Sequence, residues 1–82
     1  MVLIMNEIIS LCDIRPGQEG VVCEVGTPGA MRRRFFDIGL TRNTLVRCVG
    51  RSPSGDPSAY LIRGAVIAIR AEDCRGIRVR AV

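Results

Sequence analysis

The sequence predicts a mainly β protein, built as a small antiparallel barrel with one α-helix. Three observations support this fold class. Most apolar runs are only about five residues long and are separated by turns rich in glycine and proline, which is typical of short strands. One stretch, residues 30–38, carries apolar positions at helical spacing. Strands this short leave unpaired edges unless the sheet closes, so five strands and one helix favour a partly open barrel.

The length and composition predict a single domain that is not an enzyme. Residues 1–82 are enough for one small core that buries roughly 60% of the surface of the unfolded chain. A two-domain catalytic cleft is excluded at this length. The chain has no histidine, which excludes Ser-His, Cys-His and His-metal arrangements within it. No activated nucleophile is evident, so we expect neither catalysis nor a cofactor.

The N-terminal part is expected to supply a short turn and the first strand. Residues 10–14 are predicted to form a helical turn with Ser10 as its N-cap, and Pro-Gly at residues 16–17 ends it. Residues 21–25 are predicted to be a strand. Which face of this strand points inward stays open, because Val22 is apolar on one face and Val21, Cys23 and Val25 are apolar on the other.

The one predicted helix covers residues 30–38, and its apolar stripe is formed by Met31, Phe35 and Ile38. Gly39 is the expected left-handed residue after the helix, with Leu40 folding back onto Phe35. On the other face, Arg33 is spaced to meet Asp37 at i+4. The run Arg32-Arg33-Arg34 has two interpretations that stay open: a solvated helix face, or a docking surface for an acidic partner.

A strand is predicted over residues 44–51, after a turn in which Asn43 takes a positive φ. Burial of Val46 and Cys48 on this strand would direct Leu45 and Val49 outward. The final strand is predicted over residues 77–82, after a turn at residues 72–76 that has room for one helical turn.

The remaining two strands are expected to form a hairpin, residues 58–62 and 65–69, joined at Arg63-Gly64 and preceded by a loop at residues 53–57. The predicted cross-strand pairs are Ile62 with Ala65, Tyr60 with Ile67, and Ser58 with Ile69. This register buries the face formed by Tyr60, Ile62, Ile67 and Ile69, and leaves Arg63 and Arg70 on the other face.

The charge and the cysteines limit the choice of partners. Twelve arginines against eight acidic residues give a formal charge of +4, which permits nucleic acid or an acidic protein surface as partner. The four cysteines form no C-x-x-C pair, so no zinc site is indicated and no metal ligand is assigned. We interpret them as core thiols, with a disulfide or a soft-metal site as the alternative.

The location predicted from the sequence is the cytoplasm. The apolar stretch at residues 1–12 is short, carries Glu7 and lacks a basic start, so neither a signal peptide nor a membrane span is expected. Cysteines without a sequence partner agree with a reducing compartment. Insertion into the membrane is therefore not expected.

The order of the turns and motifs resembles the FeoA family, small cytoplasmic proteins of bacterial ferrous iron uptake. The resemblance covers a core of about residues 9–81. It is carried by Leu11…Arg15-Pro-Gly17, Gly20-Val-Val22, Arg33-Arg-Phe-Phe-Asp-Ile-Gly-Leu40, Pro53-Ser-Gly-Asp-Pro57 and Arg63-Gly…Ala68-Ile-Arg70. It implies a five-stranded SH3-like barrel. It also implies an accessory or regulatory role on FeoB, a membrane iron transporter with a cytoplasmic G-protein domain.

The candidates for contact with the cytoplasmic part of such a transporter are Arg32, Arg33, Leu45, Arg51, Asp56, Tyr60 and Arg63. For each of them a purely structural role stays open, above all Tyr60 as a core residue and Asp56 as the cap of its turn. Self-association through Leu45 and Phe36 stays open. Two other functions are kept as alternatives. One is a metal-sensing module, since the C-terminal SH3-like domain of iron-dependent repressors is similar to FeoA. The other is a nucleic-acid-binding barrel, which the small number of aromatic residues for base stacking disfavours.

Overall fold

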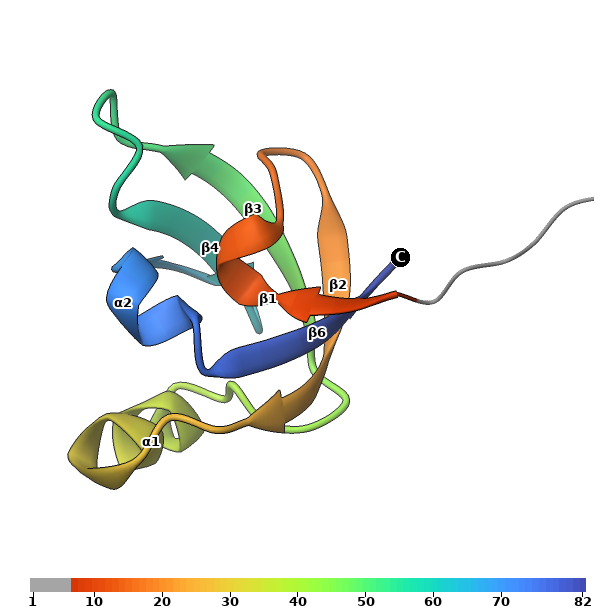
Figure 1. The fold of residues 1–82 in the computed structure, drawn as a ribbon, viewed down its shortest axis with the longest axis vertical. Helices are drawn as coiled ribbons and strands as arrows, with labels where there is room; N and C mark the ends of the chain where they lie inside the picture. Colours follow the sequence, from red (N-terminus) through yellow and green to blue (C-terminus); the bar gives the residue numbers. More distant parts are fainter. Residues whose placement is uncertain (1–6) are drawn as a thin grey trace, which may run out of the picture.

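The computed structural model describes residues 7–82, which form six strands, two helices and one 3-10 turn (Figure 1). In chain order these are β1 (Ile8–Ser10), η1 (Leu11–Asp13), β2 (Glu19–Val25), α1 (Gly29–Asp37), β3 (Leu45–Arg51), β4 (Ser58–Ile62), β5 (Ala65–Ile69), α2 (Ala71–Cys74) and β6 (Ile77–Ala81).

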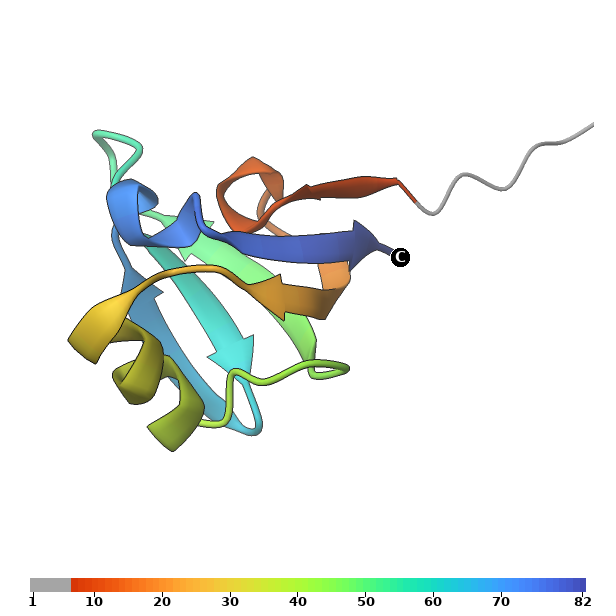
Figure 2. The ribbon, with the colours of Figure 1, turned by 60° about the horizontal axis from the view of Figure 1, so that its bottom comes forward.

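The strands form one antiparallel sheet in the order β1-β6-β2-β3-β4-β5, curled into an incompletely closed barrel. Figure 2 shows β2 and β6 crossing in front of β3 and β4, with α1 lower in the view and in front of β5. The mainly β fold with one full helix is confirmed, but the predicted number of five strands was one too few. The additional strand, β1, has three residues that pair with β6. So short a strand has no recognisable pattern of its own.

The β4–β5 hairpin has the predicted register, with Ile62 opposite Ala65, Tyr60 opposite Ile67 and Ser58 opposite Ile69. Both turn residues have positive φ, 49° at Arg63 and 85° at Gly64, as the twist of a two-residue hairpin requires. Only one face of the hairpin is buried. On the outer face, Val66 is 63% exposed.

A β-bulge determines which side chains of β2 point into the core. The ladder between β2 and β6 shifts register between Val22 and Glu24, so Cys23 is the extra residue. The shift brings both Val22 and Val25 into the core, although strict alternation would place them on opposite faces. The sequence pattern was ambiguous here because it contains no marker for a bulge.

Helix α1 ends as predicted. The Leu40 N–H donates to the Phe35 carbonyl at 2.8 Å and the Gly39 N–H donates to the Phe36 carbonyl at 3.0 Å. Gly39 has φ +92°, so the ending is a Schellman motif. Phe35 is buried, and Met31 and Ile38 pack against the edge of the core.

Two predicted local contacts are not found. Ser10 precedes η1 without a side-chain cap; its hydroxyl donates to the carbonyls of Cys74 and Arg75, because β1 pairs with β6 and so lies beside the end of α2. The expected Arg33–Asp37 ion pair is also absent. Within residues 7–82 the one ion pair joins Arg47 Nε to Glu19 Oε2 at 3.7 Å.

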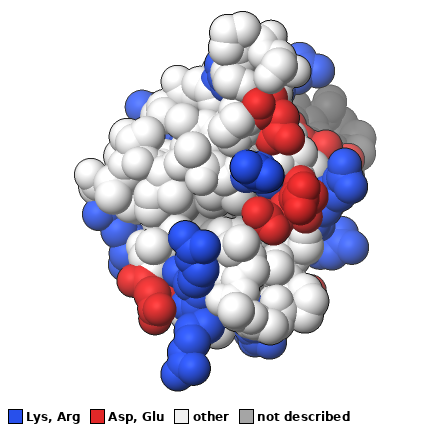
Figure 3. Space-filling view, turned by 90° about the vertical axis from the view of Figure 1, so that its left-hand side faces the viewer, with Lys and Arg blue, Asp and Glu red and all other residues white. Residues whose placement is uncertain are grey.

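The core lies inside the curled sheet and is closed at one side by α1. All four cysteines are free thiols, with Cys48 and Cys74 fully buried. Among the described residues, no helix is long and apolar enough to cross a membrane. Figure 3 shows the side that carries α2 and the loop between β3 and β4, where a broad uncharged area lies beside arginine and acidic residues.

Candidate partner-binding surface

Tyr60 is a core residue, which corrects its assignment as a contact residue. Its side chain is fully buried, because the hairpin register turns it into the barrel. The hydroxyl donates to the Leu11 carbonyl at 3.3 Å and accepts from the Cys74 thiol at 3.6 Å. Burial raises the pKa of the Tyr60 hydroxyl well above its usual value of 10, and burial also raises the pKa of Cys74 from 9.0 to about 11.

Arg51 ties the 3-10 turn to the sheet. Its Nη2 donates to the carbonyls of Cys12, at 3.1 Å, and Ile14. Its Nε donates to the Ser58 hydroxyl on β4 at 3.0 Å. With three donors engaged within the chain, most of the hydrogen-bonding capacity of this guanidinium is used internally.

Arg63 and Asp56 hold distant segments together in the same way. Arg63 Nε donates to the Gly39 carbonyl at 2.9 Å, and its Nη2 donates to the Thr44 hydroxyl at 3.1 Å. Asp56 accepts the Ala71 N–H at 2.9 Å, so it satisfies a free donor in the first turn of α2. Both side chains therefore stabilise the fold, whatever else they contact.

Arg32, Arg33 and Leu45 remain as exposed candidates, and Leu45 is 51% exposed. Arg32 has a defined setting, because its guanidinium carbon lies 5.1 Å from the centroid of the Phe36 ring. This distance is typical of a cation–π contact, and it holds an otherwise mobile side chain over the aromatic face.

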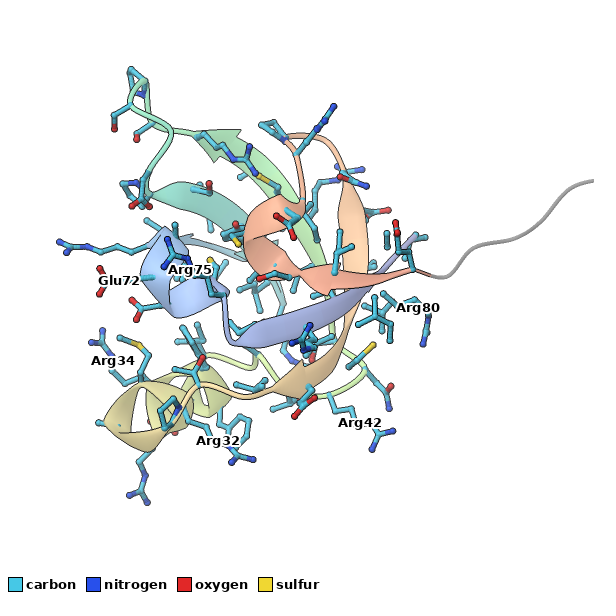
Figure 4. The ribbon with its side chains drawn as sticks, viewed as in Figure 1. Arg32, Arg34, Arg42, Glu72, Arg75 and Arg80 are labelled. Atoms are coloured by element: carbon cyan, nitrogen blue, oxygen red, sulfur yellow. The ribbon has the colours of Figure 1, made fainter. Side chains whose placement is uncertain are left out.

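Arg32 and Phe36 form part of a recess between α1 and β2, which we call the α1–β2 recess. Its lining residues are Cys23, Glu24, Val25, Gly26, Arg32, Phe36 and Arg42. Figure 4 shows Arg32 and Arg42 along the lower side of the molecule, to the right of α1 and below the end of β2. The structure does not place Arg33 or Leu45 in this lining. Arg42 was not predicted, because it follows the helix in a turn and reaches the recess only after folding.

The α1–β2 recess combines an exposed aromatic ring with a net positive charge from two arginines and one glutamate. Phe36 is 41% exposed. Arginine beside an aromatic residue is a common composition at protein–protein interfaces. No group of three or more acidic, cysteine or histidine side chains in residues 7–82 is placed to hold a metal ion.

A small barrel with a filled core can host many unrelated functions, so its role has to be argued from the surface. The chain belongs to the FeoA family, since the FeoA domain matches residues 9–81. The family predicted from the sequence motifs is thereby confirmed.

A curated relative is the Fe(2+) transport protein A/Fe(2+) transporter FeoB fusion protein of Porphyromonas gingivalis, which is 26% identical over 72 residues. The alignment covers 88% of this chain but only 8% of the fusion protein. Among solved structures, FeoA of Chlorobium tepidum is 28% identical with a TM-score of 0.85, covering 90% of this chain and 70% of that chain.

Two further structures share the fold at lower identity, and their likeness shows the fold alone. FeoA of Stenotrophomonas maltophilia in complex with zinc, described as a prokaryotic SH3 domain protein, has a TM-score of 0.77 at 23% identity, covering 87% of this chain and 88% of that chain. A manganese-dependent transcriptional repressor has a TM-score of 0.82 at 20% identity, covering 98% of this chain and 45% of that chain. The SH3-like fold is confirmed.

Proposed function

We propose that this protein is a non-enzymatic accessory protein of ferrous iron transport that associates in the cytoplasm with a FeoB-type transporter. The observation that carries the proposal is the Porphyromonas gingivalis relative, in which a FeoA part and a FeoB part form one polypeptide. A covalent link keeps two partners at a high effective concentration. Where the two are separate chains, a complementary surface has to supply the association.

The α1–β2 recess is the surface that we propose for this contact. Its exposed Phe36 offers an apolar anchor, while Arg32 and Arg42 attract an acidic partner. Arg33, on the same helix, and Leu45 are proposed as peripheral contacts. The formal charge of +4 favours encounter with an acidic surface, and such an encounter weakens with added salt.

The proposal is tested by titrating the full chain into the isolated cytoplasmic part of FeoB by calorimetry. We expect micromolar binding, weakened severalfold between low salt and about 0.5 M salt because the charges are screened. Arg32→Glu and Phe36→Ala should each weaken binding about tenfold or more, since each removes a central contact.

Arg75→Glu is the matched control, because Arg75 is exposed but lies outside the recess. This variant should bind like the original chain apart from a small general charge effect. The proposal is wrong if no heat of binding appears at low salt with hundreds of micromolar protein, or if Arg75→Glu weakens binding as much as Arg32→Glu. Circular dichroism of each variant establishes that it is folded.

A further inference from the structure

Strand β5 presents an unpaired edge. It is the last strand of the sheet and pairs only with β4. In a hairpin closed by a two-residue turn, the pair of residues that flanks the turn exchanges backbone hydrogen bonds, the next pair does not, and this alternation continues along the ladder. The backbone groups of Val66 and Ala68 therefore point away from β4. In the part of the chain that the structure describes, these groups have no hydrogen-bond partner.

Strand β5 itself lacks the sequence features that usually prevent strand addition. Natural sheets protect a free edge with charged residues, proline or a bulge. The sequence of β5 is Ala-Val-Ile-Ala-Ile, and its ladder to β4 is regular. The opposite edge of the sheet, β1, has only three residues and offers much less backbone.

A groove of about 270 Å³ runs beside this edge, between β5 and α1. Its lining residues are Met31, Arg34, Phe35, Ile38, Ile67, Ala68, Ile69, Arg70 and Asp73. Six of these nine lining residues are apolar, and Figure 3 shows uncharged surface on this side of the molecule. Arg34 and Arg70 are exposed, whereas Asp73 is half-buried, so the lining has a net positive charge.

These charges decide between two occupants, a second copy of the chain and an acidic peptide. If β5 paired with β5 of a second copy, centred on Ile67, Arg70 would lie opposite Gly64 and next to Arg63 of that copy. Two chains of formal charge +4 would then meet with arginines at both ends of the ladder. An acidic peptide instead brings charges that complement Arg34 and Arg70.

We infer that β5 and the adjoining groove bind an extended peptide that alternates apolar and acidic residues, adding it to the sheet as a seventh strand. Val66 and Ala68 would hydrogen-bond the peptide backbone, which gives affinity independent of sequence. Apolar peptide side chains would enter the groove, and acidic ones would meet the two arginines. The inference concerns a different surface from the α1–β2 recess and does not depend on binding to FeoB.

The test uses the full ¹⁵N-labelled chain and the synthetic peptide acetyl-Glu-Ile-Asp-Val-Glu-Ile-amide. We expect saturable shifts of the Val66 and Ala68 amide signals, with their hydrogen exchange slowed about tenfold when bound. Two N-methylated peptides provide the sharpest comparison. Methylation at odd or at even positions blocks opposite edges of the added strand, so one peptide should lose binding and the other should keep it.

Charge variants test the groove separately. The double substitution Arg34→Glu and Arg70→Glu should weaken peptide binding about tenfold or more, while Arg75→Glu should change it little. Three outcomes overturn the inference: no shifts at about 1 mM peptide, equal binding of both methylated peptides, or the same amide shifts on concentrating the chain without peptide. The last result would assign the edge to a second copy.

Discussion

At the scale of single residues, several polar side chains that the sequence suggested for partner contact hold the fold together. Arg51 joins strand β3 to carbonyls 37 and 39 residues earlier in the chain. Arg63 does the same across 24 residues to Gly39. Loop carbonyls near a small core need donors, and a long guanidinium can supply several in fixed directions. An arginine near the surface of a small barrel can therefore have its guanidinium donors used within the chain, where they are not available to a partner.

Replacing Arg51 should test this role directly. Arg51→Ala leaves the carbonyls of Cys12 and Ile14 without this donor, so we expect the free energy of unfolding in urea to fall by about 1–2 kcal/mol. Arg51→Lys should recover only part of the loss, because an ammonium cannot reproduce the fork of the guanidinium. Stability equal to that of the original chain in Arg51→Ala would contradict the structural role.

At the scale of secondary-structure elements, the end of α1 is linked to the β4–β5 hairpin. Gly39 terminates the helix at φ +92°, and its carbonyl accepts from Arg63 in the hairpin turn. A Cβ on Gly39 would clash with the Arg63 side chain, coming within 2.8 Å of its Nε. Helix ending and hairpin turn therefore depend on the same two residues.

A double-mutant cycle tests the link. Gly39→Ala should destabilise by about 1–3 kcal/mol, from the left-handed backbone and from displacement of Arg63. In the background of Arg63→Ala the same substitution should cost less, by at least about 0.5 kcal/mol, because the clash is gone. Chemical denaturation of the four proteins gives the coupling. Strictly additive effects would show that the two residues act independently.

At the scale of the whole molecule, two consecutive hydrogen bonds link three elements inside the core. The Cys74 thiol donates to the Tyr60 hydroxyl, which donates to the Leu11 carbonyl, and this joins α2, β4 and η1 inside the barrel. Both groups are neutral in this arrangement. Burial disfavours their anions, so it raises the pKa of each on folding.

This core predicts a loss of stability at alkaline pH. Cys74 has a pKa of 9.0 when unperturbed and about 11 in the fold, so the unfolded chain releases its proton first. The contribution is complete below about pH 9 and is lost as pH rises toward 11, by roughly 2 kcal/mol. Tyr60 adds to the loss above its usual pKa of 10.

Urea denaturation between pH 7 and pH 11 measures the effect. Because Cys74→Ala removes one of the two titrating groups, it should flatten the decline, even though the substitution lowers stability at every pH. An identical slope in Cys74→Ala would show that the thiol does not titrate with folding. Tyr60→Phe should reduce the part of the decline above pH 10.

Local chemistry was sufficient to predict much of this fold. The left-handed positions at Gly39 and Asn43 are confirmed, because the φ preference of a residue type acts within a few residues. The hairpin register is confirmed for the same reason, since a two-residue turn leaves little choice of pairing. The order of such turns along the chain was also enough to indicate the FeoA family.

Features that depend on contacts between distant segments could not be predicted from the sequence. The bulge at Cys23, the pairing of β1 with β6 and the redirected Ser10 hydroxyl all arise from contacts between parts of the chain far apart in sequence. The same limit applies to the candidate surface. Folding, and not composition, engaged Arg51 and Arg63 within the chain and brought Arg42 into the same recess as Phe36, because side-chain accessibility is a property of the packed barrel.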